Sequence, residues 1–436
     1  MAPTLEDLAA EAAARYTAAN PLSQASFERS TGFLPGADTR TVNHYAPFPV
    51  TIVRGKGARL HDLDGHEYVD FLNDHTAGLY GHSNPVIQAA IATAARNGLT
   101  LGGPTPNQQQ FAELICERFP SVERVRFTNS GTEANLMAAS LARAVTGCDG
   151  VLVFDGGYHG GPLSFTGTDR RLNIPFPWIV CDFNDMESAP SLIRELGGEL
   201  ACVLVEPMLG GGGCIPGTHA FLAALRDATQ RSGALLIFDE VQTSRLAPGG
   251  LQPVFGIHAD LTTFGKYLGG GASFGAFGGR ADLMDRFDPR RPDHFSHAGT
   301  HNNNVLTMAA GLAGLRDLLT PAAVRVLNHR GDALRDALNA VATRLDAPAQ
   351  VTGRGSIMNV HFQRGPIHRH ADLAATPQAA RDLFHLEMLL AGIWIARRGF
   401  ISVSLAHEDE DCDRLVAEFE SFLVQHAATI EGRPTP

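Results

Sequence analysis

The chain has 436 residues and a formal net charge of -11, with 44% hydrophobic and 19% charged residues. Such a length exceeds one compact core, so we expect a large domain and a smaller one. The acidic balance argues against a nucleic-acid partner, because phosphate binding needs a basic surface. No apolar run reaches the roughly 18 residues of a membrane-spanning helix, so we expect no membrane contact.

The first twenty residues resemble no targeting segment. They carry Glu6, Asp7 and Glu11 and lack an uninterrupted apolar stretch, so we expect neither a secretory signal nor a basic transit peptide there. The pattern Thr4-x-x-Asp7 is typical of a helix cap. The six cysteines are scattered without a Cys-x-x-Cys pair, which indicates reduced thiols and a cytoplasmic protein.

In chain order, Thr51–Phe71 is predicted as strands around a glycine-rich turn that contains Lys56. Short apolar runs then alternate with helical patterns such as Glu133–Val145 and His219–Gln230, which favours a mainly parallel, helix-covered α/β sheet. Its seven predicted strands are Arg124–Thr128, Gly150–Asp155, Trp178–Asp182, Ala201–Glu206, Ala234–Asp239, Leu261–Phe264 and Ser273–Gly278.

The last part of the chain reads as a smaller α+β unit. Helices are predicted over Ala322–Leu345 and Asp409–His426, with short strands around Met358–Phe362 and Ile401–Leu405. We therefore predict a large domain over residues 61–325. The N-terminal segment 1–60 and the C-terminal segment 326–436 would combine into the small domain.

The basic residues are unevenly divided between the two types. The 35 basic residues are two lysines, Lys56 and Lys266, and thirty-three arginines. A guanidinium stays charged, so it cannot replace an amine that must lose its proton to attack a carbonyl. A compositional bias toward arginine explains the arginines and makes the remaining lysines more informative. Lys266 follows the strand Leu261–Phe264 and precedes Gly269–Gly271, so we interpret it as a Schiff-base lysine in a glycine-lined pocket.

Other chemically suggestive residues follow the ends of predicted strands, where open α/β sheets bind ligands. Ser130 and Glu133 fit a capping box at a helix start. Free backbone N–H groups there, with Gly131 and Thr132, would also suit a phosphate. A capping box is common, so the motif alone leaves both interpretations open.

Two further strand ends carry an aromatic ring and a carboxylate. Tyr158, in a glycine-rich loop, could stack on a flat cofactor or be an ordinary loop tyrosine, and His159 beside it fits a structural role. Asp239 ends a buried strand, and a buried carboxylate needs a cationic partner such as a protonated pyridine nitrogen. A metal ligand or an ion-pair partner would also fit Asp239. No cluster with metal-ligand spacing accompanies it, so we expect no metal.

Taken together, these motifs resemble the class III pyridoxal-phosphate (PLP) aminotransferases in order and spacing over about residues 32–416. The resemblance implies an α/β fold of fold type I and PLP as the cofactor. The motifs that carry it are Asn129–Glu133, Tyr158–Gly160, Glu206-Pro207, Asp239–Thr243, Gly265-Lys266 and Gly299-Thr300.

The resemblance also implies roles for individual residues. Lys266 would form the Schiff base and move the proton, and Asp239 would pair with the pyridine nitrogen. Thr300 would reach the phosphate of the neighbouring subunit, so that a homodimer shares each active site. The other implied cofactor contacts are Ser130, Gly131 and Thr132 for the phosphate, and Tyr158, Val241 and Gln242 for the ring.

Within class III, the chain most resembles the β-phenylalanine aminotransferase branch, and it is related to glutamate-1-semialdehyde aminomutase. The runs similar to the first are Pro35–Arg40, Tyr45–Pro49, Thr243–Pro248, Gly299–Val305 and Arg398–Phe400, and those similar to the second are Val125–Ala134 and Gly275–Arg280.

Arg40 and Arg398 match positions that bind substrate carboxylates in that branch. In a β-amino donor the carboxylate lies one carbon farther from the reacting carbon than in an α-keto acceptor. Two alternative arginines could bind the two carboxylates at these different positions. With thirty-three arginines, an arbitrary one is usually a solvated surface residue, and Arg397 is hardly distinguishable from Arg398. Arg245 has no assignment. The resemblance would place His75 near the substrate, at a position where a tyrosine is expected.

We therefore expect a cytoplasmic homodimer whose only other partners are small molecules. It would move the amino group of an aromatic or short aliphatic β-amino acid to an α-keto acid such as 2-oxoglutarate or pyruvate, by ping-pong chemistry. The alternative is an aminomutase or a PLP-dependent amino-acid racemase. A non-catalytic PLP-binding protein is a remote alternative, disfavoured by the retention of Lys266.

Overall fold

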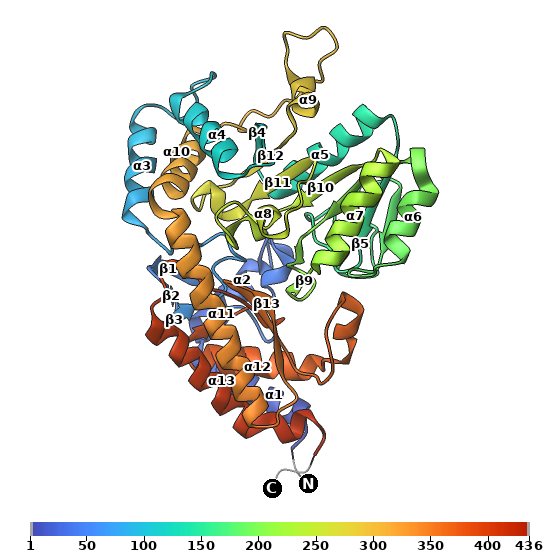
Figure 1. Cartoon of the computed structure of the whole chain (residues 1–436). Helices are drawn as coiled ribbons and strands as arrows, with labels where there is room; N and C mark the ends of the chain where they lie inside the picture. Colours follow the sequence, from blue (N-terminus) through green and yellow to red (C-terminus); the bar gives the residue numbers. More distant parts are fainter. Residues whose placement is uncertain (1–2, 434–436) are drawn as a thin grey trace.

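A seven-stranded sheet forms the centre of the computed structural model, which describes residues 3–433 and leaves 1–2 and 434–436 outside (Figure 1). The strand order is β4-β12-β11-β10-β7-β5-β6, and only β12 runs antiparallel to its neighbours. The strands are β4 (Arg124–Thr128), β5 (Gly150–Phe154), β6 (Trp178–Cys181), β7 (Leu200–Val205), β10 (Leu235–Asp239), β11 (Leu261–Gly265) and β12 (Gly275–Gly279).

These are the seven strands predicted from the sequence, with bounds that differ by at most two residues. The prediction of a mainly parallel seven-stranded sheet is confirmed. The prediction succeeded because strands that are buried on both faces have short, nearly continuous apolar sequences.

Apolar clusters cover both faces of the sheet. Successive side chains of a strand point to opposite faces, so Leu236 and Phe238 of β10 join one cluster, whereas Leu235 and Ile237 join the other. Helices α6 (Ser188–Leu196) and α7 (His219–Ser232) pack on the first face, and α5 (Gly131–Thr146) packs on the second.

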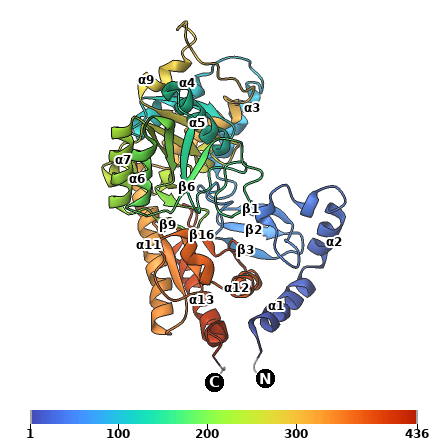
Figure 2. The ribbon, with the colours of Figure 1, turned by 90° about the vertical axis from the view of Figure 1, so that its right-hand side faces the viewer.

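The two ends of the chain meet in a second sheet. It contains β1 (Ile52–Lys56), β2 (Arg59–Asp62), β3 (Glu67–Asp70) and, from the C-terminal part, β15 (Ile393–Trp394), which pairs parallel with β3. Figure 2 shows these strands below the large sheet, beside the helices of both termini. The domain limits near residues 60 and 325 stay a prediction.

The predicted glycine-rich turn around Lys56 was wrong in extent. β1 continues through Gly55 and ends at Lys56, and Gly55 pairs with Leu60. A Cβ atom at Gly55 would lie 2.5 Å from the ring of His82. Glycine at this position allows His82 to pack closely against the strand. The glycines around Lys56 therefore do not all belong to a turn, as the sequence had suggested.

The remaining helices and short strands lie outside these two sheets. The predicted cap is present: Thr4 and Asp7 form a full capping box at α1. The helices not yet named are α1 (Leu5–Ala19), α2 (Pro21–Ser30), α3 (Pro85–Arg96), α4 (Pro106–Arg118), α8 (Gln252–Phe255), α9 (Ala281–Met284), α10 (Val305–Ala313), α11 (Pro321–Arg344), α12 (Gln378–Leu390) and α13 (Asp409–Ile430). The remaining strands are β8 (Met208–Leu209), β9 (Ile215–Pro216), β13 (Gln350–Arg354), β14 (Ile357–His361) and β16 (Phe400–Ser402).

Among residues 3–433, none of the helices has the length and apolar character needed to cross a membrane. All six cysteines have free thiols.

Candidate active site

A cavity of about 160 Å³ lies at the carboxyl edge of the large sheet. Parallel strands bring their carboxyl ends to the same edge, so residues distant in sequence gather there. The lining residues are Gly131, Thr132, Asn135, Tyr158, His159, Gly160, Glu206, Asp239, Val241, Gln242 and Lys266. Seven of the nine residues predicted to contact a cofactor are therefore brought together, and Ser130 and Thr300 are not.

The carboxylate of Asp239 is held by three hydrogen bonds at the end of β10. Its Oδ2 accepts from Asn135 Nδ2 at 2.8 Å and lies 2.7 Å from His159 Nδ1, and its Oδ1 accepts from the N–H of Val241 at 3.0 Å. Since a carboxylate oxygen only accepts, Nδ1 of His159 carries the proton. Asp239 is 3% exposed, and these three donors offset the cost of burying its charge.

A second buried carboxylate, Glu206, follows β7 and orders two loops. It accepts from the N–H of Tyr158 and from the N–H of Gly210, each at 2.9 Å. Burial and the nearby Asp239 charge raise the pKa of Glu206. The sequence identified Glu206 only as part of a motif, whereas the structure shows that it fixes the backbone of Tyr158.

The start of α5 supplies free N–H groups at the cavity wall. Ser130 caps the helix, since its Oγ accepts from the N–H of Glu133 at 3.1 Å, and Ser130 itself does not line the cavity. The Glu133 carboxylate accepts from the N–H of Asn129 instead of that of Ser130, so the predicted capping box is only half formed. A Cβ at Gly275 would lie 2.0 Å from the carbonyl oxygen of Ser130, so glycine there lets β12 pass beneath the loop.

Lys266 stands at the junction of this cavity and a larger one of about 640 Å³, and it lines both. It directly follows β11 and adopts a left-handed φ of 52°, a conformation that non-glycine residues hold only when their surroundings impose it. Burial and the nearby cation of Arg398 lower the pKa of the Lys266 amine. The amine can therefore lose its proton more readily than an exposed lysine.

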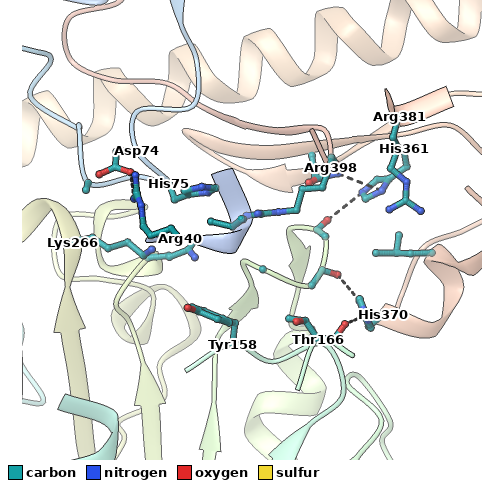
Figure 3. Close-up of a pocket in the computed structure, with 18 residues that line it drawn as sticks. Arg40, Asp74, His75, Tyr158, Thr166, Lys266, His361, His370, Arg381 and Arg398 are labelled. Atoms are coloured by element: carbon teal, nitrogen blue, oxygen red, sulfur yellow. Dashed lines mark hydrogen bonds and ion pairs between the residues drawn. The ribbon is translucent and has the colours of Figure 1, made fainter. Parts of the chain in front are cut away.

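The larger cavity brings together the three residues predicted to bind substrate. Arg40, His75 and Arg398 line it from three separate segments (Figure 3). Arg40 pairs with Asp74 at 2.5 Å. Further lining residues that carried no role in the sequence are Thr166, His361, His370 and Arg381.

Arg398 is held inside the protein without an acidic partner within the described residues. Its guanidinium lies 5.0 Å from the centre of the Phe400 ring, and its buried Nε has no hydrogen-bond partner in the described part of the chain. Burial lowers the pKa of Arg398. By contrast, Arg397 forms an ion pair with Asp382, so the structure separates two arginines that the sequence could not.

His75 is a neutral imidazole among cations. Burial, with the charges of Arg398, Lys266 and Arg40, lowers its pKa to about 2. Its Nε2 is buried and has no hydrogen-bond partner in the described residues. A neutral ring with an unused polar atom lines the cavity at this position.

Arg245 and Thr300 lie away from both cavities. Arg245 is fully buried and donates to Ser356 Oγ at 3.1 Å, to Ser402 Oγ at 3.2 Å and to the carbonyl of Val403. It therefore connects the loop after β10 to the C-terminal strands. Thr300 is exposed on the loop before α10.

Comparison with known proteins shows the family. Residues 41–423 match the Aminotransferase class-III family. The chain belongs to the class III aminotransferases. It is 50% identical over 426 residues, 98% of either chain, to the beta-phenylalanine transaminase of Variovorax paradoxus. It is 37% identical over 417 residues, 91% of this chain and 95% of the relative, to a glutamate-1-semialdehyde 2,1-aminomutase of Sorangium cellulosum.

The fold of this class III aminotransferase matches that of a solved relative. The crystal structure of a beta-phenylalanine aminotransferase from Variovorax paradoxus has a TM-score of 0.96 and 51% identity, and the match covers 97% of this chain and 98% of that chain. The fold is that of the fold-type I PLP enzymes. The resemblance drawn from the sequence motifs is thereby confirmed.

The smaller cavity fits PLP, the cofactor of class III aminotransferases. It offers a buried carboxylate, Asp239, and the free N–H groups at the start of α5 beside Thr132, which suit a phosphate. The Oε1 atom of Gln242, also at this cavity, is buried and finds no hydrogen-bond partner among residues 3–433. Such an unpaired polar atom is costly unless a bound group satisfies it.

Proposed function

We propose that this class III aminotransferase transfers the amino group of a β-amino acid, aromatic or short aliphatic, to an α-keto acid such as 2-oxoglutarate or pyruvate. The observation that carries the proposal is the placement of two guanidiniums, Arg40 and Arg398, with the Lys266 amine around one cavity. The 50% identity to the Variovorax paradoxus β-phenylalanine transaminase supports the β-amino donor.

Bound PLP would supply an aldehyde carbon and an electron-withdrawing ring that stabilises negative charge on the substrate carbon. We assign Lys266 Nζ two tasks, attachment to the cofactor and movement of the proton between substrate and cofactor carbons. Its lowered pKa favours both, because each requires the unprotonated amine. Asp239 would keep a positive charge on the ring nitrogen by ion pairing.

The other cofactor contacts are proposed from their positions at the small cavity. The residues Gly131 and Thr132, with Ser130 fixing the start of α5, would hold the phosphate. Tyr158 and Val241 would lie on the two ring faces, with Gln242 near the ring hydroxyl. His75 would contact the substrate.

The two arginines would recognise the carboxylates of the two substrates in turn. A planar guanidinium suits a carboxylate, and donor and acceptor carboxylates lie at different distances from the nitrogen that is transferred. We assign the donor carboxylate to Arg40 and the acceptor carboxylate to Arg398. Arg398 is free for this role, because the described residues give it no acidic partner.

An aminomutase is the second candidate, favoured by the 37% identity to the Sorangium cellulosum enzyme. Incubation of the holoenzyme with a β-amino acid, with and without each keto acid, separates the two. Transamination requires the acceptor for turnover. Conversion that proceeds equally well without any acceptor would remove the aminotransferase assignment.

The roles of the arginines are tested by paired variants. Arg40→Ala should raise KM for β-phenylalanine and leave KM for 1-phenylethylamine, which has no carboxylate, nearly unchanged. Arg398→Ala should raise KM for the keto acid, whereas its neighbour Arg397→Ala serves as the matched control. Equal losses with both amines would exclude carboxylate binding by Arg40.

We also propose a homodimer in which Thr300 binds the phosphate at the neighbouring subunit's site. Its exposure on a loop away from its own cavity supports a contact outside the chain. The free state of the six cysteines supports a cytoplasmic location.

A further inference from the structure

The ion pair of Arg40 and Asp74 lies at the boundary between two cavities. Both residues, with Val42 and His75, line the 640 Å³ cavity that contains Lys266 and also an adjoining cavity of about 480 Å³. Their side chains are about half exposed, 52% for Arg40 and 53% for Asp74. The pair therefore borders both cavities, and Figure 3 shows Arg40 and Asp74 together at the larger one.

Asp74 stands alone as an acid in this cavity. The 640 Å³ cavity is lined by Arg40, Arg381, Arg398 and Lys266, and Asp74 is the one carboxylate among its described lining residues. Within the part of the chain that the structure describes, neither Arg381 nor Arg398 has an acidic partner within ion-pair distance. Of the three guanidiniums that line this cavity, the one of Arg40 is thus paired with a carboxylate, whereas those of Arg381 and Arg398 have no acidic partner among the described residues.

The backbone holds Asp74 in place without help from Arg40. Residues 73–76 form a left-handed turn with φ values of 48°, 45°, 53° and 80°. Asn73 anchors the turn, since its N–H donates to Asp70 Oδ1 at 2.8 Å and its Nδ2 donates to the carbonyl of Ser402 at 2.6 Å. Non-glycine residues keep this conformation only where their surroundings enforce it.

Arg40 is likewise positioned apart from the ion pair. Its N–H donates to Asp38 Oδ1 at 2.9 Å, and Asp38 Oδ2 accepts from Asn43 Nδ2 at 2.9 Å, which fixes the loop. An exposed ion pair contributes little to holding a side chain. Loss of the Asp74 charge would therefore leave the Arg40 backbone in place and free the guanidinium.

We propose that Asp74 weakens the binding of carboxylate-bearing donors by competing with the substrate carboxylate for Arg40. This proposal rests on the assignment of the donor carboxylate to Arg40. A donor carboxylate either displaces Asp74 or shares the guanidinium with it, and in both cases the Asp74 charge opposes binding. The chain thus lowers its affinity for carboxylate donors at Arg40, while Arg398 carries no such internal competitor.

The internal carboxylate has a consequence for turnover. When the keto product leaves, Asp74 can take up the guanidinium again, so Arg40 does not remain an uncompensated cation beside Lys266. Ping-pong chemistry needs this release, because the acceptor must enter the same cavity. The Arg40–Asp74 pair therefore favours exchange of substrates over tight retention of the first.

The test uses the Asp74→Asn holoenzyme, in which the side chain keeps its size and asparagine tolerates the left-handed turn. Titration calorimetry with 3-phenylpropionate, a carboxylate without an amine, should show a Kd about two- to fivefold lower than that of the wild type. KM for β-phenylalanine should fall similarly, whereas KM for 1-phenylethylamine and for the keto acid should not. Asp317→Asn, which breaks an exposed pair with Arg316 outside both cavities, is the matched control.

Combining Asp74→Asn with Arg40→Ala shows whether Asp74 acts by competing for Arg40 or by a structural effect of its own. In the Arg40→Ala variant, adding Asp74→Asn should leave the Kd for 3-phenylpropionate unchanged. A Kd that rises or stays constant in Asp74→Asn alone overturns the proposal, and so does an equal gain without Arg40. Failure of the β-amino acid assignment is recognised separately, as a wild-type holoenzyme that binds 3-phenylpropionate but does not transaminate β-phenylalanine.

Discussion

Nδ1 of His159 lies 2.7 Å from Oδ2 of Asp239, and the two residues are 2% and 3% exposed. The imidazole therefore donates to the carboxylate and sets its orientation toward the cofactor cavity. Asn135 supports the same oxygen and receives a hydrogen bond from Thr263 Oγ1 at 2.6 Å. Two strands (β10 and β11), the loop after β5 and helix α5 thus fix a single charge at the site.

The charge of Asp239 can be removed without changing its size. An adjacent opposite charge changes a pKa by about 1–3, so Asp239→Asn should slow the half-reaction with donor by about tenfold to a thousandfold. His159→Phe keeps a ring but loses the donor, and it should have a smaller effect. Single-turnover absorbance measurements check both, and wild-type rates in Asp239→Asn would refute the ion pair with the ring nitrogen.

Lys266→Arg preserves a positive charge but removes an amine that can lose its proton. Proton transfer by a positioned side chain contributes about 10²- to 10⁴-fold, so turnover should fall by at least about a hundredfold. Borohydride reduction followed by peptide mapping should tag Lys266 in the wild type and nothing in the variant. Lys56→Arg, which changes the other lysine at the end of β1, is the control and should retain both activity and the tag.

Arg245 is predicted to stabilise the fold without binding substrate. Arg245→Met would leave the buried acceptors on Ser356, Ser402 and Val403 without their donor. We expect the free energy of unfolding to fall by about 2–5 kcal/mol. Thermal and urea denaturation measure this loss. The exposed Arg171→Met should leave the free energy of unfolding nearly unchanged, and an equally small change for Arg245 would contradict the prediction.

The pH dependence of stability should carry a contribution from Glu240. Burial raises its pKa from 4.5 to about 7, although Leu251, Gln252 and Thr243 donate to it. Between these two values the folded state binds more protons than the unfolded state, so stability falls as the pH rises. Glu240→Gln should flatten this part of the curve. Urea denaturation from pH 4 to 8 gives the slope, and an unchanged slope would exclude Glu240 as its source.

A shared active site predicts complementation between two defective subunits. If Thr300 serves the neighbouring site, a heterodimer of Lys266→Ala and Thr300→Ala contains one site with both native residues. Mixing the two variants after partial denaturation and refolding should therefore restore activity above that of either alone. No recovery, with heterodimers shown by native mass spectrometry, would place Thr300 outside the phosphate site.

The amino-acid sequence determined the central sheet and most of the cofactor cavity. Buried strands and helix starts have recognisable local sequence patterns, so the seven strands of the central sheet could be located within two residues. The rule that ligands bind at the carboxyl edge then placed Gly131, Tyr158, Asp239 and Lys266 at one cavity. The scarcity of lysine singled out Lys266 because only an amine, and not a guanidinium, can lose its proton there.

The pairing of distant segments becomes visible only in the folded chain. Asp239 contacts Asn135, 104 positions earlier in the chain, and Arg40 contacts Asp74, and no local pattern encodes either meeting. The folded chain also assigned neighbouring arginines to different partners, since Arg397 pairs with Asp382 whereas Arg398 faces the cavity. Long-range packing sets such contacts, because the sequence fixes the chemical type and size of a side chain, whereas the folded chain fixes its surroundings and hence its pKa.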